Sequence, residues 1–368
     1  MRLFLKYLYK LVLLSLVLSP TQADALVLLQ QATVLAGVEY DSNPVLASSN
    51  EQSVWRYTTL PKYTVSAVDD RTRWFATGGL SIQRSSNSAV SGSRQDPAVT
   101  AGWEYQFEKS VFNITADYSK ASSRLNEFTT SGVVDKDGTV TSKSISASWG
   151  SQLSDRLGYS VGGQYLKTTY TGSGFTNSTT KSISSSLTYE LNEKVKPFVQ
   201  VGISQLNTEG NNAKSSISKT YLLGTTVEIN PRFKISASAG LNQQQLTGNG
   251  WVANTTLNYI QEKYNLEAVL SRNVAPSGLG DFQETNNASF KYNYDLSDKA
   301  KAGADFVWNI NSATNGNETR QLTGWYSKEL SDYWQFKLSL NLKNLKNSSQ
   351  SANASIFGLS FTYNTPEF

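Results

Sequence analysis

The sequence predicts an all-β chain that closes into a transmembrane antiparallel up-and-down β-barrel of about eighteen strands, of the Gram-negative outer-membrane type. Three observations predict it. Short segments alternate apolar and polar residues along the chain, and the turns between them are alternately short and long. After the N-terminus, no apolar run is long enough for a membrane-spanning helix. Alternation with a period of two gives each strand one apolar and one polar face. A chain that repeats this pattern so often is expected to face lipid on one side and water on the other.

The N-terminus carries the pattern of a secretory signal peptide. Arg2, Lys6 and Lys10 form a basic region that precedes an apolar run at 11–18, and Ala23-Asp24-Ala25 offers a small-residue cleavage site. The apolar run is too short to span a bilayer. We therefore expect residues 1–25 to be a cleaved signal peptide and residues 26–368 to form a single barrel domain.

The composition excludes several kinds of chemistry. Cysteine and histidine are both absent, so no disulfide, thiolate nucleophile, histidine base or histidine metal site is possible. The formal net charge of +4 over 33 basic and 29 acidic residues gives no argument for nucleic-acid binding. Hydrophobic residues are only 39%, as expected when half of the strand positions face a polar lumen. We expect no enzymatic activity, cofactor or metal.

Eight short connections divide the chain into hairpins. Most pair an acidic residue with a following basic one, and Asn, Asp, Ser and Pro supply turn-forming side chains. They recur roughly every 37 residues, the length of a hairpin plus its loop. They are Asp69-Asp70-Arg71, Glu108-Lys109, Ser154-Asp155-Arg156, Asn192-Glu193-Lys194, Asn230-Pro231-Arg232, Gln261-Glu262-Lys263, Ser297-Asp298-Lys299 and Ser331-Asp332-Tyr333.

Longer connections, rich in Gly, Ser and Asn, lie between these turns. Short turns at one end and longer loops at the other are typical of outer-membrane barrels, whose short turns are periplasmic. No loop is very long, so we expect a comparatively open barrel, or one that several modest loops close together. The long connections are expected at Asp41–Gln52, Asn87–Asp96, Ser122–Gly138, Thr169–Asn177, Thr208–Lys214, Gly248-Asn249-Gly250, Val274–Asp281, Ser312–Asn317 and Asn347–Ser351.

Tryptophans mark the expected edges of the lipid band. Trp74 and Trp334 adjoin short turns, whereas Trp55 and Trp251 adjoin long loops. Amphipathic rings are best solvated at the level of the lipid headgroups, so these positions predict two aromatic girdles. The alternation is less regular at 250–260 and 317–330, and it assigns neither Trp251 nor Trp325 to a face.

The polar face of the strands supplies the candidate functional residues. A barrel of sixteen to eighteen strands leaves an aqueous channel, which favours permeation over a mere anchor. Neither sign of charge dominates the set, which argues against a strongly ion-selective pore. A wall rich in hydroxyls and amides suits a neutral or weakly charged solute such as a sugar. Each of these charged residues can also be interpreted as an ordinary lumen side chain in contact with water, without a role in selectivity. The candidate pore-lining residues are Arg73, Glu104, Asp117, Lys196, Glu228, Lys234, Lys291, Asp295, Asp305 and Lys337.

One segment resembles a known family. The run Gly37-Val38-Glu39-Tyr40-Asp41-Ser42-Asn43-Pro44 ends the first strand, and turns such as Leu-Ser-Asp-Lys and Leu-Asn-Glu-Lys recur later. These features resemble the outer-membrane β-barrel porins of exopolysaccharide and exosortase (PEP-CTERM) gene clusters. The resemblance implies a conduit for a secreted polysaccharide, working with a periplasmic export protein. It carries over no catalytic residues.

The sequence therefore predicts an integral protein of the Gram-negative outer membrane. Its expected surroundings are outer-membrane lipid and lipopolysaccharide. The terminal Phe368 resembles the signal that the barrel-assembly machinery reads during biogenesis. The expected function is a passive channel that exports an exopolysaccharide. The alternatives are a general or sugar-type diffusion porin and a non-conducting structural or adhesive barrel.

Overall fold

The computed structural model describes most of the predicted barrel domain. The expected signal peptide at 1–25 and the terminal Phe368 lie outside the described residues. The described residues are 26–130, 137–172, 174–210, 213–245, 248–311, 316–347 and 351–366.

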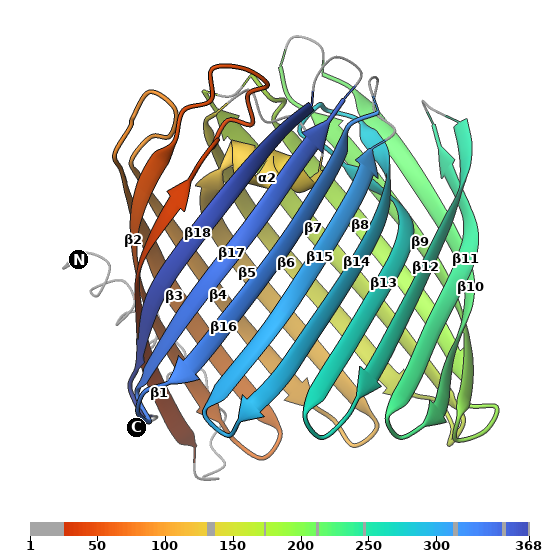
Figure 1. Ribbon diagram of the computed structural model, residues 1–368. Helices are drawn as coiled ribbons and strands as arrows, with labels where there is room; N and C mark the ends of the chain where they lie inside the picture. The colour runs from red at the N-terminus through yellow and green to blue at the C-terminus, as the bar shows by residue number, and fades with distance from the viewer. Residues whose placement is uncertain are drawn as a thin grey trace.

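The described residues form an 18-stranded antiparallel sheet that closes on itself, which confirms the predicted fold class (Figure 1). Each strand pairs with its neighbours in sequence, and β1 also pairs with β18 to complete the ring. The strands are β1 Val27–Asp41, β2 Val54–Val68, β3 Thr72–Ser85, β4 Arg94–Gln106, β5 Ser110–Ser122, β6 Thr139–Gln152, β7 Leu157–Thr171, β8 Ser178–Tyr189, β9 Val195–Thr208, β10 Ser215–Asn230, β11 Phe233–Gln244, β12 Gly248–Ile260, β13 Tyr264–Pro276, β14 Phe282–Ser297, β15 Ala300–Asn311, β16 Glu318–Glu329, β17 Trp334–Lys346 and β18 Ser351–Asn364.

The eight short turns fall where the sequence predicts them, at one end of the barrel. One long connection is displaced. Gly248, Asn249 and Gly250 begin β12, where Asn249 and Gly250 pair with Gln243 and Asn242 of β11. Gly248 is therefore the last residue of the connection and not its centre. It adopts a φ of +92°, which glycine tolerates readily.

Ladder register fixes which residues share a face. Residues directly opposite each other on neighbouring strands point to the same side of the sheet. Large apolar side chains dominate the outer side; Leu223 is 67% exposed and Leu270 60% exposed. Trp251 is opposite Leu241 and faces outward. Trp325 is opposite Gly303 and faces the lumen, where its ring covers the place of the missing Gly303 side chain.

Aromatic side chains gather beside the short turns on the outer face. Trp74 stacks on Trp103 at 5.2 Å, and Phe107 stacks on Trp149 at 5.5 Å. On β17 and β18, at the same end of the barrel, Trp334 lies 5.1 Å from Tyr363. At the long-loop end, Tyr40 and Trp55 lie 5.1 Å apart. This distribution agrees with the predicted girdles and limits the apolar band between them.

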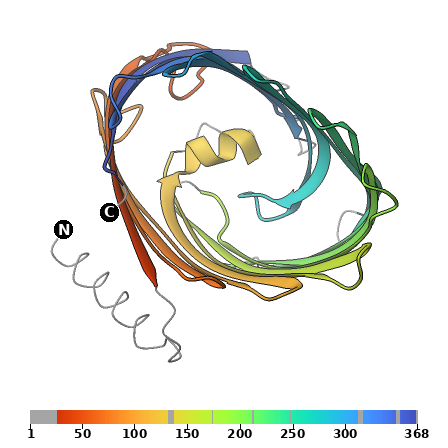
Figure 2. The ribbon, with the colours of Figure 1, turned by 90° about the horizontal axis from the view of Figure 1, so that it is seen from below.

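The described part of the chain also contains a helix, α2 (Ser123–Thr130), inside the barrel ring (Figure 2). The sequence predicts a long connection at Ser122–Gly138 and no helix within it, so the structure adds this element. An eight-residue helix shows barely two turns of periodicity, too little to stand out among Ser, Thr and Gly. No helix among the described residues is long and apolar enough to cross a membrane.

Candidate permeation path and its constriction

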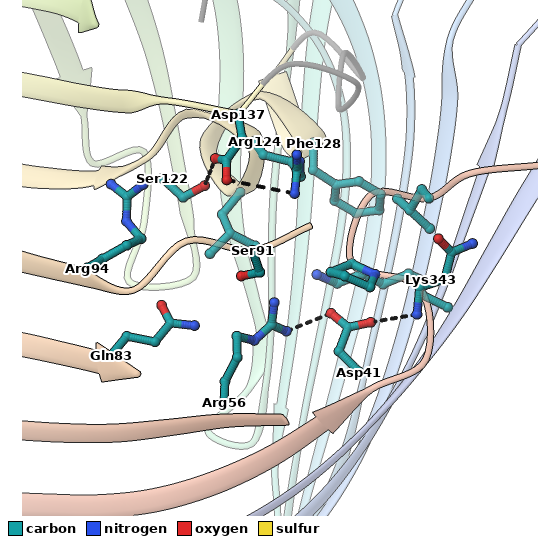
Figure 3. A pocket seen from close by; sticks show the side chains of 15 residues that line it. Asp41, Arg56, Gln83, Ser91, Arg94, Ser122, Arg124, Phe128, Asp137 and Lys343 are labelled. Carbon is teal, nitrogen blue, oxygen red and sulfur yellow. Dashed lines mark hydrogen bonds and ion pairs between the residues drawn. The ribbon is translucent and has the colours of Figure 1, made fainter. Parts of the chain in front are cut away.

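The base of α2 is fixed to the inner wall beside β5. The Arg124 guanidinium donates to the Val90 carbonyl at 2.8 Å and lies 3.8 Å from the Asp137 carboxylate. The Ser122 hydroxyl donates to the same carboxylate at 3.1 Å. Asp137 therefore joins the two ends of the connection that carries the helix, as Figure 3 shows.

The far end of α2 packs against the part of the ring where β1 and β18 close the barrel. Phe128 is 4% exposed and belongs to a buried apolar cluster, and the Lys343 ammonium lies 5.2 Å from the centre of its ring. These cluster residues come from the β1–β2 loop and from the inner wall of β17 and β18, so the helix extends from β5 into the lumen (Figure 2). The other members of the cluster are Leu46, Leu345, Ala352 and Ala354.

The middle of α2 meets two further elements through Glu127, Tyr170 and Gly278, which we call the latch. Glu127 is fully buried, and the Tyr170 hydroxyl of β7 donates to its carboxylate at 2.6 Å. Gly278 belongs to the β13–β14 loop. A Cβ at that position would lie 2.9 Å from both Glu127 Oε1 and the Tyr170 hydroxyl oxygen. The same loop contacts the β7–β8 loop, because the Gly278 carbonyl accepts from the Thr176 amide at 2.8 Å. The latch therefore connects α2 both to β7 and to the β13–β14 loop.

Two charge clusters, one buried and one half-buried, support this constriction from the wall. The Arg56 guanidinium donates to both Glu39 and Asp41, at 2.6 Å to the latter, and Arg56 and Asp41 are almost fully buried. Arg94 binds Asp96 at 2.8 Å and donates to the Gly138 carbonyl at 2.9 Å. Because each guanidinium has a carboxylate partner, neither cluster adds a large field of one sign.

The space enclosed between α2 and these clusters is small. Its volume is about 40 Å³, enough for one or two water molecules and far below that of a sugar. Asp41, Arg56, Arg124 and Lys343 line it (Figure 3). This cavity is therefore part of the packing of the constriction and is too small to hold a transported solute.

The structure gives the segment Gly37–Pro44 a local role. Asp41 pairs with Arg56 and also accepts the Asn43 amide at 3.1 Å. The fully buried Asn43 side chain donates to the Ala47 carbonyl at 2.8 Å and to the Asn353 carbonyl of β18 at 3.0 Å. These residues fold the first loop and fasten it to the last strand, close to the closure of the barrel.

The ladder register puts all ten candidate pore-lining residues on the face that carries Arg56 and surrounds α2. Arg73 is opposite Glu104, Glu228 is opposite Lys234, and Lys291 is opposite Asp305. Asp117 accepts from the Thr100 and Ser144 hydroxyls at 2.8 and 3.2 Å. Lys196 pairs with Glu190, and Asp295 lies 3.4 Å from Lys301. Lys337 lies 5.2 Å from the Trp325 ring. That they line a conducting path stays a prediction.

Most of these ten residues lie toward the short-turn end, away from the constriction. None of the residues that form the constriction itself is among the ten predicted from the sequence. Glu39 and Asp41 were open to detection, because they alternate with the outward Val38 and Tyr40. Their partner Arg56 could not be assigned without the register of β1 with β2. The latch residues are far apart in sequence and share no pattern. Among the described residues, no group of acidic side chains could hold a metal ion.

No model of a known protein family matches the chain, and no curated protein sequence matches it. Similar solved structures exist. OccAB4 of Acinetobacter baumannii is 11% identical, with a TM-score of 0.54 over 94% of this chain and 100% of that one. The siderophore receptor PirA of Acinetobacter baumannii is 8% identical, with a TM-score of 0.51 over 91% of this chain and 80% of that one.

A mutant of the ferric enterobactin receptor PfeA of Pseudomonas aeruginosa gives the same TM-score of 0.51 at 8% identity, over 91% of this chain and 80% of that one. At such identities the likeness concerns the fold alone. Together with the apolar outer band and its aromatic edges, it defines the architecture and its setting. The chain has the fold of the integral β-barrels of the Gram-negative outer membrane.

Proposed function

We propose that the chain is a passive outer-membrane channel for hydrophilic solutes with little net charge, of which sugars fit best. The proposal depends on how polar groups are divided around the lumen. No inward position of β6, β7 or β8 carries a charged residue. We call these three inner strand faces the neutral wall. Its polar side chains are Ser142, Ser144, Ser146, Ser148, Gln152, Ser160, Gln164, Thr168, Tyr170, Ser178, Thr180, Ser182, Ser184, Ser186 and Thr188.

The charged residues of the remaining wall support the same solute class. Several of them occur as opposed acidic and basic side chains, such as Glu228 with Lys234 and Lys291 with Asp305. A ring of one sign would concentrate counter-ions and exclude co-ions, whereas paired charges produce little selectivity. Hydroxyl groups can donate and accept hydrogen bonds, which suits a solute that does both. Four side chains of the neutral wall, Gln152, Ser160, Ser186 and Thr188, also line a shallow groove of about 550 Å³ near the short turns, together with Glu108 and Lys109 of the β4–β5 turn.

Solute flux into liposomes tests the proposal. Proteoliposomes should swell in neutral monosaccharides and disaccharides at least as fast as in gluconate or glucosamine of similar size. The expected order of rates is set by solute size and not by charge. A rate that rises tenfold or more for one charged sugar would overturn the proposal.

Export of a secreted polysaccharide is the second candidate. The resemblance of Gly37–Pro44 to the porins of exopolysaccharide gene clusters suggests it, and the neutral wall extends over the full length of its three strands. A sliding polymer needs such a continuous surface, whereas a small solute needs only a short selective segment. A periplasmic export protein would then be the partner. Deletion of the gene should abolish surface polysaccharide, and normal secretion would exclude this role.

The third possibility is a barrel that does not conduct and serves as a structural or adhesive element. The contacts of α2 in the lumen are the observation in its favour. Planar-bilayer recording separates it from both transport roles, since a non-conducting barrel produces no current steps. We propose transport rather than catalysis for all described inner surfaces.

A further inference from the structure

The outer surface of the barrel differs strongly in charge between its two ends. At the short-turn end, Lys328 is the one charged side chain that the described strands direct outward. At the long-loop end, nine basic side chains face outward from the strands. They are Arg84, Lys120, Lys143, Lys167, Lys181, Lys219, Arg272, Arg320 and Lys346.

Acidic residues balance only some of this charge. Glu284 and Glu318 face outward at the same end, and both are paired with arginines, Arg272 and Arg320 respectively. Glu209 lies 2.7 Å from Lys167. Within the described ranges, the other six of the nine outward basic side chains have no carboxylate within ion-pair distance.

Four of the lysines form one patch on adjacent strands, which we call the lysine patch: Lys120, Lys143, Lys167 and Lys181 on β5 to β8. Lys143 and Lys167 are directly opposite each other in the ladder. Lys120 is opposite Thr141, two residues from Lys143, and Lys181 is two residues beyond the partner of Lys167. Directly opposed like charges destabilise a sheet. Glu209 offsets the charge of Lys167, whereas Lys143 has no carboxylate partner among the described residues.

The lysine patch adjoins the lipid band. The next outward-facing residue after Lys143 on β6 is Ile145, and the next after Lys181 on β8 is Ile183. Both lie nearer the short turns, and they are 46% and 56% exposed. The Lys143 ammonium also lies 6.0 Å from the Tyr118 ring, an aromatic at the same level. The ammonium groups therefore lie at the level of the headgroups, on the outer-leaflet side of the membrane.

We propose that the lysine patch binds the phosphate groups of a phosphorylated glycolipid in the outer leaflet. Ammonium groups pair with phosphate oxygens as point charges, and several lysines on one surface match a headgroup that carries more than one phosphate. The bound lipid's acyl chains would cover the exposed Ile145 and Ile183. Near Lys143, the phosphate would supply the anionic partner that Glu209 supplies to Lys167.

Binding of lipid A bisphosphate to the folded barrel in detergent tests this assignment by native mass spectrometry. The test variant combines Lys120→Gln, Lys143→Gln and Lys181→Gln. Its matched control combines Lys109→Gln, Lys194→Gln and Lys263→Gln, three exposed lysines in the short turns at the other end. Both variants lose three positive charges, so they differ only in where the charge is removed.

The patch variant should bind lipid A bisphosphate roughly 100-fold more weakly, because each lysine at an anionic surface contributes about a factor of five. The control variant should bind as the parent does. Unchanged binding by the patch variant, or equal weakening by the control, would overturn the proposal. Equal weakening toward lipid A without phosphates would also overturn it, because phosphate would then not be the recognised group.

Thermal unfolding shows whether weaker binding by the patch variant reflects a loss of folding. Without lipid A, the patch variant should be at least as stable as the parent, because it loses the repulsion between opposed lysines. Added lipid A bisphosphate should raise the unfolding temperature of the parent more than that of the single variant Lys143→Gln. An equal rise in both would overturn the proposal.

Discussion

Replacing Tyr170 by Phe tests the latch most directly. The substitution removes one hydroxyl and leaves the ring in place. In the structure that hydroxyl donates to the fully buried Glu127 carboxylate at 2.6 Å. A hydrogen bond to a charged acceptor contributes about 1.5–3 kcal/mol. Its loss should therefore shift the equilibrium toward undocked α2 by a factor of roughly 10 to 150 at room temperature.

Hydrogen exchange of the α2 amides measures this equilibrium. When opening and closing are fast, the exchange rate is proportional to the population of the open form. Peptides that cover α2 should exchange about 10- to 150-fold faster in Tyr170→Phe. Peptides from the centres of the strands should not change, because their ladders do not involve the latch.

Tyr165→Phe is the matched control. Tyr165 is on the same strand but faces outward and is 42% exposed, so loss of its hydroxyl should leave α2 unchanged. Exchange of α2 that is the same in Tyr170→Phe and the parent would refute the reasoning. Equal acceleration by Tyr165→Phe would refute it as well, because the effect would then not pass through Glu127.

Three further predictions concern the constriction. Gly278→Ala places a methyl group 2.9 Å from two latch atoms and should accelerate α2 exchange, whereas Gly92→Ala, with open space around it, should not. Arg56→Met leaves the buried Asp41 carboxylate without its guanidinium, so the urea midpoint should fall by an amount equivalent to about 3–5 kcal/mol. An unchanged midpoint would contradict the burial of that pair. Phe128→Ala should cost about 3–5 kcal/mol of α2 docking, visible as complete loss of exchange protection in α2.

The barrel itself could be predicted from local sequence because its two signals are local. Alternation within a strand needs only side-chain spacing, and short turns such as Asn230-Pro231-Arg232 need only turn chemistry. The Gly248–Gly250 connection was misplaced for a local reason too. Glycine marks both the centre and the end of a turn, and only the backbone angle separates the two uses.

The constriction could not be predicted because it depends on contacts between distant segments. Glu127, Tyr170 and Gly278 come from three different connections or strands, and each is ordinary in its own sequence context. The pairing of Arg56 with Glu39 and Asp41 required the register of β1 with β2, because a shift by two residues would keep the same alternation and change the partners. The pore-lining candidates were accessible because each one depended only on parity within its own strand.

Single-channel recording in planar bilayers tests the central claim, that this barrel is a passive channel with little charge preference. The parent protein should give discrete current steps, and its reversal potential in a KCl gradient should lie near zero. Tyr170→Phe should show larger or longer steps, since α2 is docked for less of the time. A reversal potential near the Nernst potential of one ion would contradict the account, and so would an absence of current in the parent and in Tyr170→Phe alike.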